Sequence, residues 1–323
     1  MASANSTFTE LVSTTYRKHR STVKDNLSNR NALLKRMKQR GNYRLEDGGL
    51  TIACPLDYNA NSTYQRFSDW DVLNISQSEA LSAAEYQWRQ IAINVVASGR
   101  EIRINSGESQ IINLAKARLK NAIRTFSNSF SSDLYSAGSL TNQINGLQAI
   151  VADTNTNTVG GIDANVWSFW RNTVFDLSDQ SPAVTISATT IELQAMLPLW
   201  LSLDRGPDDQ PDLIVMDNVY YTYFEGSQVS FKRYASSQSA DGGLVSLKYK
   251  GADVLYDTSA TGIPASHAYF LNTNYLELVA HRDADMEEME EMRPVNQDGA
   301  VIPILWMGNL TCSNRALQGV IKA

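Results

Sequence analysis

The chain has 323 residues, of which 43% are hydrophobic and 19% are charged, and this composition excludes a disordered tail and a small disulfide-stapled domain. A chain of this length can bury roughly 75% of its extended surface, enough for one large or two ordinary cores. The formal net charge of −6 argues against a dedicated nucleic-acid-binding protein, because such proteins usually carry a basic domain.

The first segment of the chain is basic. Residues 1–44 carry 10 Lys or Arg and two acidic residues, a net charge of +8, which leaves −14 on the rest of the chain. From Phe8 to Arg40 apolar and basic residues interleave without a regular period, so we expect this segment to lie across a partner surface or to stay partly disordered until it does. A solvated basic tail is the alternative. Its candidate contact residues are Arg17, Lys18, Arg20, Lys35, Arg36, Lys38 and Arg40.

The next segment predicts an extended hairpin. Alternate residues from Leu50 to Leu56 are apolar and would lie on one face of a strand, while residues 64–75 predict a second, aromatic-rich strand. A lone hairpin has too little core to be stable by itself, so we expect it to pack on another surface. The candidate contact residues of the hairpin are Leu50, Ile52, Tyr64, Phe67 and Trp70.

A long helix follows two further predicted strands, at residues 86–96 and 100–104. From Ser106 to about Tyr135 apolar residues recur at spacings of three and four, which predicts a helix about 45 Å long. We expect Asn105, with Glu108 three residues later, to cap its start.

The second half of the chain predicts one more helix and a series of strands. The helix would begin at Thr189 and end near Gly206, with Pro198 as a candidate kink. The predicted strands cover residues 213–216, 245–249, 254–256, 269–271, 276–280 and 301–307. This order, with the long helix early and the strands late, predicts an α+β fold.

Chemical motifs are scarce. The chain has no Walker loop, no serine nucleophile elbow and no His-Glu-x-x-His motif. Asp153 to Asn157 begins like a calcium loop, but Thr158 stands where such a loop needs glycine, so we expect a polar turn. Cys54 and Cys312 lie far apart in a pattern typical of reduced, buried thiols. We therefore predict no catalytic, cofactor-binding or metal-binding residues.

Acidic residues cluster at Asp208–Asp209 and from Asp283 to Glu291. We expect both clusters to be solvated surface. The alternative is a carbohydrate-active enzyme, whose chemistry needs two carboxylates and which could use Trp167, Trp170 or Trp200 as a sugar platform.

The chain contains neither a secretory signal nor a run of about 18 apolar residues. We therefore expect a soluble protein that stays in the compartment where it is made and has no membrane partner.

Several local sequences, taken in order, resemble one family. They are Ser98-Gly99-Arg100-Glu101 and Asn105-Ser106-Gly107-Glu108 before the long helix, Asn145 to Ile150 after it, and then Phe270 to Leu276, Pro294 to Asp298 and Gly308 to Leu310. In this order, over roughly residues 45–320, the chain resembles the major capsid proteins of tailed bacteriophages, which have the Hong Kong 97 type of capsid fold.

The resemblance implies a division of the chain. The N-arm would cover residues 1–47, the E-loop hairpin 48–76, a peripheral domain with the spine helix 77–138, the axial domain 139–267, and the return strands of the peripheral domain with the C-terminus 268–323. The E-loop of one subunit would lie on the peripheral domain of a neighbour.

The resemblance also implies a structural, non-enzymatic role without a cofactor. Copies would assemble into pentamers and hexamers of an icosahedral capsid that encloses double-stranded DNA without sequence-specific binding. Scaffolding, portal and decoration proteins would be further partners, and the protein would reside in the virion after assembly in the host cytoplasm. We expect the basic arm to dock on an acidic patch of a neighbour, with candidate residues Asp283, Asp285, Glu287 and Glu288.

Two other functions remain open. An encapsulin-like bacterial compartment shell shares the fold but would enclose protein cargo. A nucleic-acid-binding protein would use the basic segment and would lose DNA affinity steeply as salt rises.

Overall fold

The computed structural model describes residues 32–76, 79–100, 108–206, 209–228, 247–257, 262–290, 292–293 and 296–323. The expected contacts Arg17, Lys18 and Arg20 lie outside these ranges, as does the expected helix cap Asn105. Of the strand expected at residues 100–104, only Arg100 is described, and it is helical.

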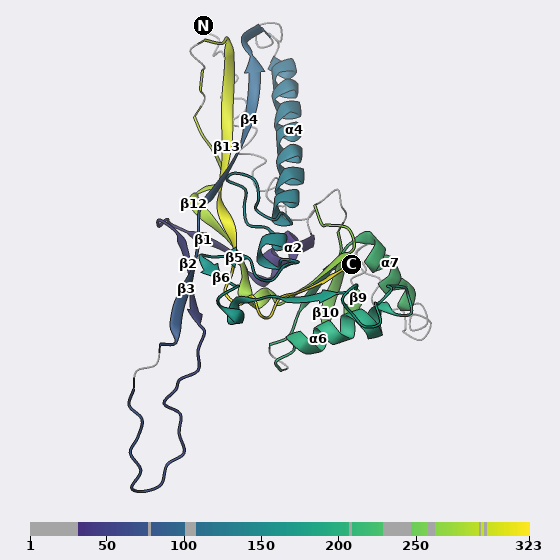
Figure 1. Ribbon diagram of the computed structural model, residues 1–323. Coiled ribbons are helices and arrows are strands. Elements are labelled where there is room, and N and C mark those ends of the chain that lie inside the picture. The colour runs from purple at the N-terminus through teal and green to yellow at the C-terminus, as the bar shows by residue number, and fades with distance from the viewer. Residues whose placement is uncertain are drawn as a thin grey trace.

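A four-stranded sheet and the long helix form an elongated arm (Figure 1). The strands lie in the order β1 (Tyr43–Glu46), β12 (Leu276–Glu288), β13 (Gly299–Cys312) and β4 (Arg89–Ser98). β1 runs parallel to β12, and the other two pairings are antiparallel.

The long helix is confirmed as α4 (Glu108–Leu134), whose 27 residues make it about 40 Å long. Its buried side chains follow the spacing of three and four residues that the sequence predicts, including Phe126 and Phe130. The ring of Phe130 meets that of Trp306 on β13 edge to face, with centroids 4.8 Å apart. The helix therefore covers one face of the four-stranded sheet.

A six-stranded sheet forms the second part of the structure. Its strands are β7 (Thr173–Asp176), β14 (Gly319–Lys322), β11 (His267–Leu271), β8 (Leu213–Met216), β10 (Ala252–Tyr256) and β9 (Leu247–Tyr249), in that order. One face packs against the helices α6 (Leu197–Leu203) and α7 (Asn218–Ser227) and the π-helical segment η2 (Ile191–Met196). β8 is buried along its whole length, as expected for a central strand with both faces covered.

The remaining elements are short and belong to neither of these two sheets. They are α2 (Ala32–Arg40), β2 (Ile52–Asp57), β3 (Leu81–Tyr86), α5 (Leu147–Ile150), β5 (Thr158–Val159), β6 (Ile162–Asp163), and the 3-10 turns η1 (Ser168–Trp170) and η4 (Thr273–Tyr275).

The hairpin differs from the prediction in its second strand. β2 pairs with β3, so the strand expected at residues 64–75 is wrong, and the described residues between 58 and 80 form a long irregular loop without a strand (Figure 1). Side chains hold the two sides of this loop together. Gln65 Nε2 donates a hydrogen bond of 3.1 Å to the carbonyl of Val72, and the amide of Asn74 donates one of 3.1 Å to Gln65 Oε1. Polar side chains thus replace the ladder that a strand would form.

The strand expected at residues 86–96 is divided into two. Tyr86 ends β3 and Arg89 begins β4, because the chain passes from the hairpin to the four-stranded sheet between them. Asn309 Nδ2 fixes this crossing by donating a hydrogen bond of 2.9 Å to the carbonyl of Gln87.

The last part of the basic segment is a helix that packs against its own chain, without a partner protein. Leu33, Leu34 and Met37 of α2 are buried in the core of their own chain. The expectation for the described part of this segment was wrong because its apolar residues fall on one face of a single short helix.

The late strands are confirmed, but two assignments change. β11 and β14 belong to the six-stranded sheet, so the division expected at residues 267 and 268 does not separate the two sheets. The strand expected at residues 276–280 continues to Glu288 and takes in part of the acidic cluster. The helix expected after Thr189 begins as η2 and continues as α6, and the change from one to the other lies beside Pro198, which has no N–H to donate to the preceding turn.

Candidate functional site

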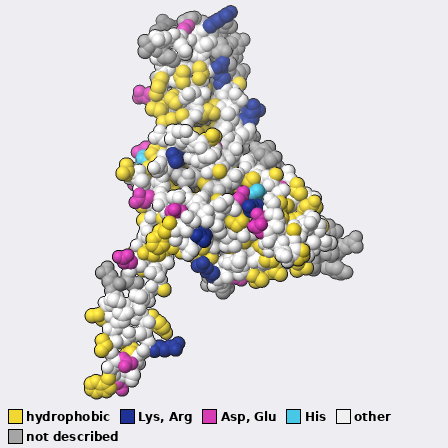
Figure 2. Space-filling model, viewed as in Figure 1, with side chains coloured by type: hydrophobic (Ala, Val, Ile, Leu, Met, Phe, Trp, Pro, Cys, Tyr) yellow, Lys and Arg dark blue, Asp and Glu magenta, His cyan; other side chains and the backbone are white. Residues whose placement is uncertain are grey.

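The loop between β2 and β3 exposes large apolar side chains to solvent, as the lower end of Figure 2 shows. Trp70 is 97% exposed, and each of the others is more than half exposed. They are Tyr64, Phe67, Val72, Leu73 and Ile75, and the apolar surface extends to Leu50 just before β2 and Leu81 at the start of β3. Exposed apolar patches of this kind on a soluble chain mark interaction sites.

The apex of the loop is an ordered turn. The amide of Asp71 donates a hydrogen bond of 3.0 Å to the carbonyl of Ser68, and the amide of Ser68 donates one of 2.8 Å to Asp71 Oδ2. These two bonds fix Asp69 and Trp70 at the apex, so the apolar residues are presented on a partly preorganised loop.

The base of the hairpin is anchored in its own chain. Ile52 is fully buried, so its side chain offers no surface to a neighbouring subunit, contrary to the expectation for this residue. Tyr86 Oη donates a hydrogen bond of 2.9 Å to the carbonyl of Cys312, which ties β3 to β13. Burial raises the pKa of the Cys54 thiol, and it raises that of Cys312 to about 12, so both cysteines are protonated core residues. The loop therefore projects from a fixed base.

A second apolar surface lies on the face of the four-stranded sheet that points away from α4. Trp306 and its even-numbered neighbours on β13 point toward α4, so odd-numbered residues point to the other face. In the register of β4 and β13, Val301 lies beside Val96, and Leu305 lies beside Ala92. Val96 is 47% exposed, and Figure 2 shows hydrophobic side chains gathered over this part of the arm. The sequence analysis did not predict this surface. Its signal is that apolar residues stand at both odd-numbered and even-numbered positions of β13.

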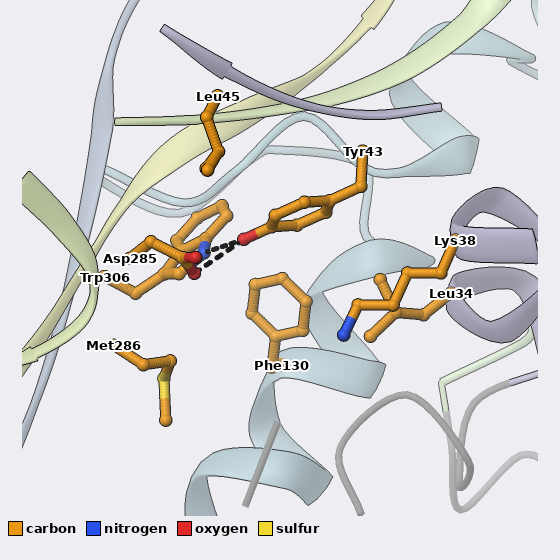
Figure 3. Close-up of a pocket in the computed structure, with 8 residues that line it drawn as sticks. All are labelled: Leu34, Lys38, Tyr43, Leu45, Phe130, Asp285, Met286 and Trp306. Atoms are coloured by element: carbon orange, nitrogen blue, oxygen red, sulfur yellow. Dashed lines mark hydrogen bonds between the residues drawn. The ribbon is translucent and has the colours of Figure 1, made fainter. Parts of the chain in front are cut away.

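A pocket of about 270 Å³ lies where α2 meets the arm, beside β1 (Figure 3). Its lining residues are Leu34, Lys38, Tyr43, Leu45, Phe130, Asp285, Met286 and Trp306. Tyr43 Oη donates a hydrogen bond of 2.7 Å to Asp285 Oδ1 and accepts one of 3.4 Å from Trp306 Nε1. Burial of the Tyr43 ring raises its pKa, and the negative charge of Asp285 raises it further, so the phenol stays protonated and donates.

An irregular stretch of β12 shapes this pocket. Ala280 lies opposite Gly308, but the next pair along the ladder joins Asp285 to Trp306, so β12 bulges by several residues. Met286 has a φ of 56°, a left-handed conformation that is rare for a residue with a side chain. A Cβ at Gly308 would lie 2.2 Å from the carbonyl oxygen of Val279, so only glycine fits beside the bulge.

The basic residues predicted as contacts with another subunit differ in their surroundings on α2. Arg36 forms an ion pair of 2.8 Å with Asp253 on β10, and Arg40 forms one of 2.8 Å with Asp212 before β8. Lys38 lines the pocket, with Nζ 5.6 Å from the centre of the Tyr43 ring. The arginines thus join α2 to the six-stranded sheet of the same chain.

The residues of the predicted acidic patch also differ in their exposure to solvent. Asp283 is exposed, and Glu287 and Glu288 are half-buried. Asp285 is only 6% exposed and bonds to Tyr43, so the expectation of a solvated surface cluster is wrong for this residue. Its side chain faces the pocket because of the bulge.

The features that suggested an enzyme or a metal site have structural partners. Trp167 is 48% exposed, and its ring meets those of Tyr58 and Phe169 edge to face. Trp170 and Trp200 are buried, and Trp170 Nε1 donates a hydrogen bond of 2.9 Å to the carbonyl of Val159, so neither ring is a sugar platform. Asp153 forms a 3.1 Å contact with His267, and Asn157 Nδ2 donates to the carbonyl of Ala149, which agrees with a polar turn. Within the described ranges, no three or more metal-binding side chains gather in one place. Likewise, none of the described helices combines the length and apolar character needed to cross a bilayer.

No family model matches the chain, and no curated protein matches its sequence. Solved structures do match over nearly the whole chain. The cyanophage A-1(L) capsid is 16% identical, with 87% of this chain and 90% of that chain covered and a TM-score of 0.61. The capsid of Myoviridae phage XM1 is 10% identical, with 89% and 91% covered and a TM-score of 0.52.

An encapsulin matches at a similar level. The holo-SrpI encapsulin complex from Synechococcus elongatus is 10% identical, with 87% of this chain and 84% of that chain covered and a TM-score of 0.51. These similarities confirm the predicted α+β class and the Hong Kong 97 type of fold found in tailed-phage capsids.

Proposed function

We propose that the chain is the structural subunit of an icosahedral capsid of a tailed bacteriophage, self-assembling into pentamers and hexamers. One observation carries this proposal. The chain has two apolar surfaces that it cannot cover itself, the loop with Phe67 and Trp70 and the outer face of β4 and β13. Each of these surfaces is exposed in a single chain. Contacts between copies of the same chain would bury both.

The geometry suits a ring of identical contacts. The loop extends away from the body of its own chain (Figure 1), so the surface that it covers belongs to a neighbour. A contact between two different surfaces of the same chain runs head to tail and closes into rings when the rotation allows it. Each large aromatic side chain can bury on the order of 150–250 Å², and repeated contacts around a closed shell add by multivalency.

The charge distribution supports a container for DNA rather than a DNA-reading protein. Outside residues 1–44 the chain carries a net charge of −14, which limits adhesion to packaged double-stranded DNA. We therefore infer that the DNA is enclosed without sequence-specific binding, in a virion assembled in the host cytoplasm. We also propose scaffolding, portal and decoration proteins as partners, and neither catalysis nor a cofactor.

The proposal is tested on the purified full-length chain. We expect negative-stain electron microscopy to reveal closed shells or sheets of capsomers, and sedimentation velocity to give species far above the 35.8 kDa of one chain. A uniform monomer at high concentration in both measurements would overturn the proposal.

A bacterial compartment shell of the encapsulin type is the second candidate, and the similarity to the SrpI encapsulin favours it. The two candidates differ in what the shell encloses. Particles from the native source should contain nuclease-protected double-stranded DNA if the protein is a capsid subunit, and a protein cargo without such DNA if it is a compartment shell.

A further inference from the structure

We propose that Trp70 of one copy inserts into the pocket between α2, β1 and the bulge of β12 on a second copy. This inference rests on the proposed self-assembly and goes further, because it assigns one anchoring side chain to one cavity.

The pocket has the size and lining for a single large side chain. Its volume of about 270 Å³ lies just below the roughly 300–1,000 Å³ of sites for whole small molecules. Figure 3 shows the rings of Tyr43 and Phe130 and the side chain of Met286 around the same space, contributed by β1, α4 and β12. Aromatic and thioether surfaces of this kind pack well against an indole ring.

Trp70 is the side chain on the loop that is best placed to enter a cavity. It is 97% exposed and stands at the apex of the turn closed by Ser68 and Asp71. Because hydrogen bonds already fix the turn, little conformational freedom is lost when the ring is buried. Tryptophan is also among the residues that contribute most to binding at protein interfaces.

The charges beside Trp70 on the loop and those at the rim of the pocket are opposite in sign. Asp69 and Asp71 flank Trp70 on the loop, whereas Lys38 lines the pocket and Lys35 lies one turn earlier on the same side of α2. An acidic turn would thus approach a basic rim. Inside the pocket the carboxylate of Asp285 is an acceptor for the indole N–H, in addition to its bond from Tyr43.

The occupant must come from another copy. In its own chain the loop extends away from the pocket, as Figure 1 shows, and the base of the hairpin is held by the bond from Tyr86 to Cys312. The apex therefore cannot reach the pocket of the same chain.

A double-mutant cycle tests the pairing. Trp70→Ala removes the side chain, and Leu45→Trp fills the pocket from its own chain at a position that is 42% exposed. We expect each change to lower the temperature at which shells dissociate, and the double variant to be no worse than Trp70→Ala alone. Additive losses would mean that the residues act separately and would overturn the inference. Leu140→Trp, at an exposed position outside the pocket lining, is the matched control and should leave the shells unchanged.

Crosslinking provides a second test that does not depend on every subunit being altered. Chains with Leu45→Cys and chains with Trp70→Cys are assembled with excess wild-type chain and treated with a short bis-maleimide. Covalent dimers should form only when both variants are present, because the native Cys54 and Cys312 are buried. Shells that form without such dimers would overturn this inference alone, whereas failure of the wild-type chain to form any shell would overturn the proposed function.

Discussion

Tyr43 and Asp285 are joined by a hydrogen bond of 2.7 Å across 242 positions of the sequence. This bond connects β1, which follows the basic N-terminal segment, to the bulged part of β12 in the arm. The bond lies in the pocket. The same contact therefore holds two distant segments of one chain together and shapes a cavity that a second copy of the chain can enter. Variants that change the exposed surfaces should therefore alter assembly, whereas variants that change the internal contacts should alter folding.

Assembly should depend on the exposed loop without any loss of folding. Phe67 is 67% exposed and contributes to the apolar surface, so Phe67→Ser should leave the monomer folded and reduce shell yield severalfold. Ala60→Ser, at an exposed position on the same loop, is the control and should assemble normally. The measurements are shell yield by sedimentation and folding by circular dichroism. Equal yields for the two variants would contradict the assigned role of the loop.

The four basic residues of α2 should divide into two classes. Arg36 and Arg40 pair with Asp253 and Asp212 of the same chain, so neutralising either should lower the free energy of unfolding by about 1–3 kcal/mol. Urea unfolding of the single variants measures this loss.

The lysines of α2 should act on assembly instead. Neutralising Lys35 and Lys38 together should weaken assembly and its tolerance of salt, while the free energy of unfolding of the monomer falls by only about 1 kcal/mol, because Lys38 also lies over the Tyr43 ring. Shells of unchanged yield and salt tolerance would exclude docking by these two lysines.

Arg315 should contribute far more to stability than an exposed arginine does. It is fully buried, and its guanidinium donates hydrogen bonds of 2.7 Å to the carbonyl of Ile150 and of 2.7 Å to Asn157 Oδ1. Arg315→Leu would leave these acceptors without a donor, so we expect a loss of about 3–5 kcal/mol in urea unfolding. Arg282→Leu removes an exposed ion pair with Asp47 and should cost less than about 1 kcal/mol. Similar losses for both variants would contradict the structural role of Arg315.

The contact of His267 with Asp153 should make stability depend on pH. Burial of the ring lowers the pKa of His267, but its hydrogen bond to Asp153 and the other favourable contacts outweigh this, so the pKa is raised. The hydrogen bond from His267 lowers the pKa of Asp153. The histidine therefore stabilises the fold below about pH 6.5, and this contribution is lost as the pH rises through its raised pKa. The aspartate stabilises the fold above about pH 4, and that contribution is lost as the pH falls through its lowered pKa.

His267→Gln should therefore reduce the melting temperature more at pH 5.5 than at pH 8.5. Because the Asp153 side chain is 42% exposed, we expect a difference of only about 1–2 °C. Differential scanning fluorimetry measures it, with His281→Gln as the control. A loss that is the same at both pH values would show that the ion pair contributes nothing.

The sequence predicts those parts of the fold in which a local period decides the structure. The long helix follows from apolar residues such as Phe126 and Phe130 at helical spacing, and β8 follows from a short apolar run. Residues 64–75 are apolar enough for a strand, yet they have no sheet to pack on, and bonds such as that from Gln65 to Val72 take the place of a ladder. No local pattern distinguishes these two cases.

The candidate site was predicted only in part for the same reason. Phe67 and Trp70 are recognisable from sequence as apolar residues on a segment without a core of its own. Asp285 belongs to an acidic run that is typical of a solvated surface, and only the bulge of β12 brings it into the pocket with Tyr43. A contact between residues 242 positions apart depends on the whole fold, so it has no local signal.

A cryo-electron microscopy reconstruction of the particles formed by the full-length chain tests the central claim most directly. We predict a closed shell in which the loop of each subunit lies against a neighbour, with Phe67 and Trp70 buried between copies. A particle in which this loop projects into solvent, or folds back on its own chain, would contradict the account.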